Sequence, residues 1–191
     1  MKTKLAIFAS GSGTNAEEII GYFDGHEKIS VSLILTNNKS AFVLKRALNH
    51  KISHFIFDRQ MFYKEKTVDE VLKLNGIDFI VLAGFMWLMP ERFVKTYPNK
   101  IVNIHPALLP KYGGKGMYGQ FVHEAVVNNK EKESGITIHW VNEEYDKGSI
   151  IRQAKCKIKP SDTPEDVANK VHSLEYEYYP KVIEEVILEN I

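Results

Sequence analysis

The stretch "KLAIFASGSGTNAEEII", residues 4–20, places a short apolar run directly before a glycine-containing turn and the start of a helical pattern. The run Lys4–Ser10 predicts a buried strand, and Asn15–Phe23 predicts a helix. A strand followed at once by a helix is half of a βαβ unit, the building block of parallel sheets. This stretch therefore sets the fold class that the rest of the chain has to match.

The rest of the chain repeats this order and so predicts a doubly wound α/β fold, with a mostly parallel sheet and helices on both faces. Further strands are predicted at residues 29–37, 77–85, 100–105 and 135–141, with a weaker one at 52–57, and further helices at 41–49, 62–74 and 120–129.

The C-terminal part of the chain departs from the alternation. Residues 149–158 predict an antiparallel strand, and a long helix follows it. Thr163 is the expected cap of that helix, Pro164 suits its first turn, and Glu165 and Asp166 suit its positive end. No repeat or linker interrupts the pattern, so we expect residues 1–191 to form a single domain.

The composition of the chain limits which binding partners are expected. The chain has 191 residues and a net charge of +1, with acidic and basic residues interspersed, so a nucleic-acid partner is not expected, although a small anion is. The single cysteine, Cys156, excludes an internal disulfide and fits a reducing compartment. The apolar run "LAIFAS" is too short for a secretion signal or a membrane span. We therefore expect a cytoplasmic protein without a membrane partner.

The turn "GSGTN", residues 11–15, falls where ligands bind in doubly wound sheets, at the carboxyl end of a strand. Gly11 and Gly13 let backbone N–H groups approach a ligand, and Thr14, Asn15 and the helix start suit an anion. A dinucleotide fingerprint would need glycine at Ala16, and the Gly-Lys-Ser/Thr ending of a P-loop is missing. A single phosphate is the predicted ligand, and the alternative is a tight turn that binds nothing.

A second segment at this edge, "VLAGFMWLMP", residues 81–90, combines a strand end with a long apolar connection. Such a run is most often a corner of the core. Beside a phosphate loop it also suits a flat aromatic ligand, with exposed backbone groups reading the ligand's polar edge.

The segment "IVNIHPALLPKYGGKGMYG", residues 101–119, carries an amide and an imidazole on one strand. Asn103 and His105 are two residues apart and so point to the same side, and Pro106 ends the strand. Together they suit a carbonyl oxygen that gains negative charge. Asp146, before Gly148, is the predicted carboxylate that orients His105 and favours its charged form. The alternatives are a core histidine and an ordinary turn aspartate.

Four segments, "GSGTN", "VLAGFMWLM", "VNIHPALLPKYGG" and "YDKGSII", occur in this order and with separations that resemble the folate-dependent formyltransferases over essentially the whole chain. The resemblance implies a Rossmann-like domain in which Asn103, His105 and Asp146 are catalytic. It implies formyl transfer from 10-formyltetrahydrofolate to the amine of glycinamide ribonucleotide, in purine synthesis. No metal is expected, the partners are small-molecule substrates, and we expect a monomer or weak homodimer.

The resemblance also implies two groups of binding residues. The ribonucleotide would be bound by Ser12, Gly13, Thr14, Asn15, Pro106 and Glu175. The folate would be bound by Phe85, Met86, Trp87, Leu88, Met89, Val141, Asn142, Glu143 and Glu144. Two departures from well-known members concern the folate tail and a loop: Trp87 replaces an arginine, and residues 111–120 replace a histidine-containing segment with glycines, Lys115 and Met117.

Other functions stay open at this point. Methionyl-tRNA formyltransferases carry a further C-terminal domain and bind tRNA, and formyltetrahydrofolate hydrolases carry an N-terminal regulatory domain. Sugar-nucleotide formyltransferases have no evident need for the phosphate loop. A non-catalytic ribonucleotide-binding module would have no use for Asn103 beside His105 and Asp146.

Overall fold

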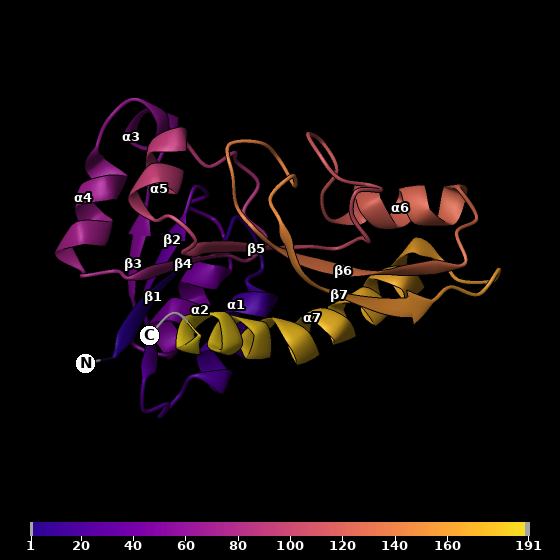
Figure 1. Cartoon of the computed structure of the whole chain (residues 1–191), viewed down its shortest axis with the longest axis horizontal. Coiled ribbons are helices and arrows are strands. Elements are labelled where there is room, and N and C mark those ends of the chain that lie inside the picture. The colour runs from indigo at the N-terminus through magenta and orange to yellow at the C-terminus, as the bar shows by residue number, and fades with distance from the viewer. Residues whose placement is uncertain (1, 190–191) are drawn as a thin grey trace.

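The computed structural model describes residues 2–189, which form a seven-stranded sheet of order β3-β2-β1-β4-β5-β6-β7 with helices around it (Figure 1). The strands are β1 (Thr3–Phe8), β2 (Ile29–Thr36), β3 (Ser53–Ile56), β4 (Phe79–Leu82), β5 (Ile101–His105), β6 (Glu133–Trp140) and β7 (Ile150–Lys157). The helices are α1 (Thr14–Tyr22), α2 (Val43–Asn49), α3 (Arg59–Tyr63), α4 (Thr67–Leu74), α5 (Glu91–Thr96), α6 (Gln120–Asn128) and α7 (Pro164–Leu188). The predicted α/β class is confirmed.

The helices cover both faces of the sheet. One core holds residues of α1, α2 and α7, and the other holds residues of α3, α4 and α5, which Figure 1 shows on the opposite side. In β1, four consecutive residues from Leu5 to Phe8 are fully buried, because alternate side chains enter the two cores. This burial on both faces explains why the strand reads as a continuous apolar run.

The direction of the strands changes earlier than predicted. Strands β1 to β5 pair in parallel, whereas β6 is antiparallel to β5 and β7 is antiparallel to β6. The predicted strand at 149–158 is thus confirmed as β7, but antiparallel pairing begins at β6. Order and direction together place the carboxyl ends of β1, β4 and β5 side by side, which is where doubly wound sheets bind ligands.

The prediction of one helix over residues 62–74 is wrong, because two short helices occupy residues 59–74. The Asp58 side chain accepts a hydrogen bond from the Met61 N–H and so starts α3 earlier. The Arg92 guanidinium donates to the carbonyl oxygens of Phe62 and Glu65 and so satisfies helix-end acceptors between α3 and α4. Arg92 belongs to α5, which has no counterpart among the predicted helices.

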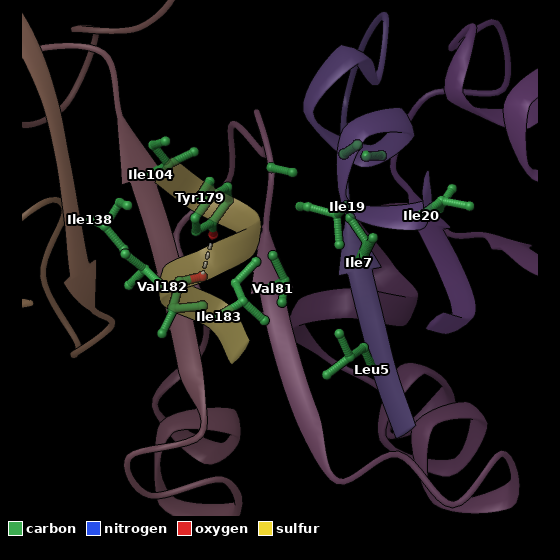
Figure 2. Packing of buried hydrophobic residues seen from close by; sticks show 14 of the residues in the cluster. Leu5, Ile7, Ile19, Ile20, Val81, Ile104, Ile138, Tyr179, Val182 and Ile183 are labelled. Atoms are coloured by element: carbon green, nitrogen blue, oxygen red, sulfur yellow. Dashed lines mark hydrogen bonds between the residues drawn. The ribbon is translucent and has the colours of Figure 1, made fainter. Parts of the chain in front are cut away.

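Helix α7 begins as predicted and spans the sheet. Thr163 and Asp166 form a reciprocal capping box, and Pro164 lies in the first turn. Figure 2 shows Tyr179, Val182 and Ile183 of this helix among the buried residues of the strands. The Tyr179 hydroxyl lies 2.9 Å from the Leu82 carbonyl oxygen and 3.2 Å from that of Val102. In the described part of the chain, no helix combines the length and apolar character needed to cross a membrane.

Candidate active site at the carboxyl ends of β1, β4 and β5

A pocket of about 530 Å³ opens at the carboxyl ends of β1, β4 and β5. Its walls come from the turn after β1, the strand ends of β4 and β5, the loop before α6, the loop after β6, and α6 and α7. The lining residues that enter the arguments below are Gly11 to Asn15, Phe85, Met86, Asn103, His105, Pro106, Lys115, His123, Tyr145, Asp146, His172 and Glu175.

The turn at residues 11–15 is held in one conformation by its neighbours. Gly13 has φ +69°, and a Cβ atom there would lie 2.5 Å from the Val43 side chain, so only glycine fits. The Arg46 Nε–H donates to the Ser12 carbonyl oxygen at 2.9 Å, and Glu17 anchors Arg46. The N–H groups of the first turn of α1, which begins at Thr14, have no intrahelical partners and can bind an anion.

Asn103, His105 and Asp146, predicted to act together, do converge in this pocket. Asp146 Oδ1 lies 3.5 Å from Asn103 Nδ2, and Asp146 Oδ2 lies 3.5 Å from His105 Nδ1. The His105 Nε2–H donates to the Tyr112 carbonyl oxygen at 2.7 Å. Both ring nitrogens of His105 therefore face an acceptor, an arrangement that only the doubly protonated ring satisfies in full.

Burial opposes that charged form. It lowers the pKa of His105 below its ordinary value, and the Asp146 carboxylate and the Tyr112 carbonyl, which raise the pKa, do not compensate. The predicted direction of the Asp146 effect thus agrees with the structure, but the net pKa of His105 is lowered and the ring is neutral at neutral pH. Asp146 differs: burial raises its pKa, but His139, His105 and the Gly114 N–H together hold it below the ordinary value.

Asp146 is positioned by a contact with the loop before α6 and by the close packing of its own loop against β6. The Gly114 N–H donates to Asp146 Oδ2 at 2.9 Å, so the glycine-rich loop before α6 contacts the carboxylate directly. On the other side, a Cβ atom at Gly148 would lie 1.6 Å from the Trp140 carbonyl oxygen. Position 148 therefore has to be glycine for the loop of Asp146 to pass this close to β6.

His139 on β6 was not singled out in the sequence, yet it contacts two of the three predicted catalytic residues. Its Nδ1–H donates to the Trp140 carbonyl oxygen at 2.8 Å, so in the neutral ring Nε2 carries a lone pair that accepts from Asn103 Nδ2 at 3.0 Å. Asp146 Oδ1 lies 3.6 Å from the same Nε2. The only sequence signal was a histidine within an otherwise apolar predicted strand.

Glu175 also lines the pocket and contacts the glycine turn at residues 11–15. Asn15 Nδ2 donates to Glu175 Oε2 at 2.9 Å, which joins α1 to α7. Burial raises the pKa of Glu175 to about 7, and the Asn15 bond only partly offsets this. The Asn15 Oδ1 atom is buried without a hydrogen-bond partner. This corner thus offers substrate a carboxyl group and an open acceptor.

Residues predicted to bind folate are only partly in the pocket. Phe85 and Met86 line it, but Trp87, Leu88 and Met89 do not. Trp87 packs in an aromatic cluster, with the Arg59 guanidinium 4.9 Å from its ring centroid, and Met89 is buried in the core.

The second predicted folate-binding segment, residues 141–144, also lies outside the pocket lining, whereas the neighbouring Tyr145 is part of it. For Trp87, Leu88, Met89 and residues 141–144, a role in folate binding stays a prediction. Within residues 2–189, no group of three or more His, Cys, Asp or Glu side chains is placed to hold a metal ion.

Residues 3–183 match the formyl transferase family, and the chain belongs to this family. A phosphoribosylglycinamide formyltransferase of Arabidopsis thaliana, described as chloroplastic, is 39% identical over 199 residues, which cover 100% of this chain and 67% of the relative. The enzyme of the same name from Bacillus subtilis is 35% identical, covering 96% of this chain and 94% of the relative.

Solved structures show similarity to the same enzymes. The crystal structure of phosphoribosylglycinamide formyltransferase from Bacillus halodurans matches with a TM-score of 0.87 and 36% identity, covering 97% of this chain and 95% of that chain. Sequence and structure thus point to the same branch of the family.

Proposed function

We propose that this chain is a phosphoribosylglycinamide formyltransferase, which transfers the formyl group of 10-formyltetrahydrofolate to the amine of glycinamide ribonucleotide in purine synthesis. One observation carries the proposal: Asn103, His105 and Asp146 share a single pocket with the glycine turn at residues 11–15. The turn suits a phosphate and the three side chains suit acyl transfer, so one molecule that carries both a phosphate and an amine can reach both.

The first step is the deprotonation of the acceptor. An α-amino group of this kind has a pKa of about 8 and enters largely as an ammonium ion. It gives one proton to His105 Nδ1, which faces the Asp146 carboxylate at 3.5 Å. The ring then carries a proton on each nitrogen, and Asp146 stabilises its charge.

The second step is attack on the formyl carbon. The amine nitrogen forms a new C–N bond, and the carbonyl oxygen becomes an oxyanion that accepts hydrogen bonds from Asn103 Nδ2 and the protonated His105. His139 occupies one of the two Asn103 amide protons, and the other makes only a long contact of 3.5 Å with Asp146. That second proton is the one available to the oxyanion.

The third step breaks the C–N bond to the folate. The departing folate nitrogen takes the bond's electron pair and a second proton from the former amine, moved by Asp146 directly or through water. The products are the formylated amide and tetrahydrofolate, and His105 returns its proton to solvent. The whole sequence releases one proton and requires no metal.

The decisive experiment follows the absorbance of the folate product with glycinamide ribonucleotide, an amino sugar nucleotide or water as the acceptor. We expect turnover with glycinamide ribonucleotide alone. Equal turnover without any amine would identify a hydrolase, and a preference for the sugar nucleotide would move the chain to another branch of the family. Ribonucleotide binding without turnover would identify a binding module.

A further inference from the structure

A second cavity, of about 180 Å³, lies beside the start of β6 and shares no lining residue with the pocket described above. The segment after β5, the end of α6 and the turn between α6 and β6 line it. Ser134 on this wall is only 2% exposed, and its Oγ atom is buried without a hydrogen-bond partner among the described residues. A buried hydroxyl without a partner is costly, so its presence at a cavity wall indicates a ligand contact.

Two carboxylates line the same cavity. The Lys111 ammonium and the Tyr112 hydroxyl donate to Glu131 Oε1 at 2.8 and 2.9 Å, and Lys155 pairs with Glu133 Oε2 at 3.1 Å. In the described part of the chain, Glu131 Oε2 and Glu133 Oε1 receive no hydrogen bond. The bonds from Lys111 and Tyr112 hold the pKa of Glu131 below its ordinary value, so this carboxylate is charged at neutral pH. Together with the buried hydroxyl, three side-chain oxygens are therefore open to a ligand.

These three oxygens indicate the chemistry of the ligand. Two carboxylates repel an anion, whereas an ammonium group offers a positive charge and three N–H donors. Leu108 and Val126 add an apolar wall, which suits a short alkyl chain. A cavity of about 150 Å³ holds benzene, so this one has room for about six or seven non-hydrogen atoms.

We propose that this cavity binds a short aliphatic primary amine in its protonated form, whose ammonium group donates hydrogen bonds to Glu131, Glu133 and Ser134. The inference goes beyond the proposed function and does not depend on it, because the cavity and the pocket have no lining residue in common.

Tyr112 connects this cavity to the pocket. Its hydroxyl donates to Glu131, and its carbonyl oxygen accepts from His105 Nε2 at 2.7 Å. Tyr112 has φ +56°, in the left-handed region that side chains rarely adopt, so the bond to Glu131 helps to hold an unfavourable conformation. An amine that binds Glu131 thus acts on the residue that also contacts the His105 ring. We expect occupancy of the cavity to shift the NMR signals of that ring.

The test measures binding of butylamine to the full chain by calorimetry at pH 7 and constant ionic strength. We expect a Kd of about 1 mM or lower, and binding at least about tenfold weaker in Ser134→Ala and in Glu133→Gln. The alcohol 1-butanol has the same number of non-hydrogen atoms but no charge, and it should also bind at least about tenfold more weakly. Ser40→Ala and Glu18→Gln, at exposed positions elsewhere in the chain, are the matched controls.

The variants also distinguish this cavity from the larger pocket, where Asp146 and Glu175 offer carboxyl groups. That pocket is the weaker competitor for an amine, because Lys115 lines it and the Asp146 carboxylate already accepts from the Gly114 N–H. Equal binding by the wild type and both variants would place the amine elsewhere and overturn the inference. Equal binding of 1-butanol and butylamine would overturn the assignment of an ammonium ligand.

Stability separates a lost contact from a damaged fold. Because Ser134 Oγ has no partner among the described residues, Ser134→Ala should resist urea at least as well as the wild type. Histidine NMR spectra with saturating butylamine then test the link through Tyr112. The His105 signals should shift in the wild type and not in Ser134→Ala at the same concentration. Binding that leaves the His105 signals unchanged in the wild type would overturn that link.

Discussion

Asn103 depends on a histidine that takes no direct part in the proposed reaction. The Nδ1–H of His139 donates to the Trp140 carbonyl, so in the neutral ring Nε2 is an acceptor and orients the Asn103 amide with the nitrogen toward itself. The second amide proton then points toward the carboxylate of Asp146 and the site of the reaction. At the scale of single residues, the site is a set of donors whose directions are fixed before substrate arrives.

Replacing Asn103 with alanine tests this role. Removal of one oxyanion donor typically costs about 2.7–4 kcal/mol of transition-state stabilisation, so we expect kcat to fall by a factor of about 100 to 1,000. The KM values should change less, because the bond strengthens only in the transition state. Steady-state kinetics measures both, with the exposed Asn128→Ala at the end of α6 as the control. Unchanged turnover would contradict the role of Asn103.

Replacing Asp146 with asparagine tests the electrostatic link to His105. The carboxylate raises the pKa of His105 against the stronger effect of burial, so its removal should lower that pKa further. A histidine NMR titration of the free protein, with His105 assigned by mutation, measures the change. Asp24→Asn, at an exposed position, should leave the pKa of His105 unchanged. If the pKa of His105 stays constant or rises in Asp146→Asn, Asp146 acts at most as a proton carrier.

At the scale of elements, α7 contributes side chains both to the pocket and to the hydrophobic core. Its early turns carry His172 and Glu175 into the pocket, and its later turns pack Tyr179, Val182 and Ile183 into the core. The Tyr179 hydroxyl faces the carbonyl oxygens of Leu82 at the end of β4 and Val102 on β5, and so bridges two strands that supply pocket residues. The position of the pocket thus depends on a fully buried side chain.

Replacing Tyr179 with phenylalanine removes only the hydroxyl. The two carbonyl oxygens lose a buried donor, so we expect the free energy of unfolding to fall by about 1–3 kcal/mol. Urea unfolding measures the loss. Tyr178→Phe, at a half-buried position on the same helix, should have little effect. Equal stability of Tyr179→Phe and the wild type would mean that the two carbonyls are satisfied in another way.

The elements also show what the sequence could predict. Strands β1 and β4 were predictable because burial on both faces requires unbroken apolar runs, and β2 and β5 because they are mostly β-branched and apolar. The same-side placement of Asn103 and His105 followed from the alternation of a strand. The division between α3 and α4 was not predictable, because it depends on Arg92, about thirty residues further along the chain.

The missed histidines have a related explanation. Local sequence does not reveal that His123 of α6 and His172 of α7 line the same pocket, or that His139 of β6 contacts the pocket residue Asn103. Each alone reads as an ordinary histidine in a helix or strand. Only the packing of α7 against α6, β5 and β6 brings these rings into the same part of the molecule.

At the scale of the whole molecule, two buried groups oppose each other in the pH dependence of stability. The pKa of Glu175 rises to about 7 in the folded chain, so between 4.5 and 7 the folded state holds a proton that the unfolded chain releases. This makes the free energy of unfolding fall as pH rises through that range. The pKa of His123 falls from 6.5 to about 4, which makes the free energy of unfolding rise with pH between these values.

Replacing Glu175 with glutamine removes one side of this balance. A change in pKa from 4.5 to about 7 corresponds to about 3 kcal/mol, so Glu175→Gln should exceed the wild type in stability by up to that amount above pH 7. The advantage should shrink as pH falls and vanish near pH 4.5. Urea unfolding from pH 4.5 to 8 measures it, and Glu177→Gln on the exposed side of α7 is the control. A difference independent of pH would contradict the titration of Glu175.

The order of strands also sets the distance between two parts of the pocket. The glycine turn follows β1 and the Asn103–His105 pair ends β5, with β4 alone between them. Neighbouring strands lie about 4.8 Å apart, so under the proposed function two spacings would put about 10 Å between the phosphate of the acceptor and the reacting carbon. An acceptor whose phosphate and amine lie much closer together than this distance would then not reach both positions at once. Under the proposed function, the spacing of the sheet backbone would therefore select acceptors by their length.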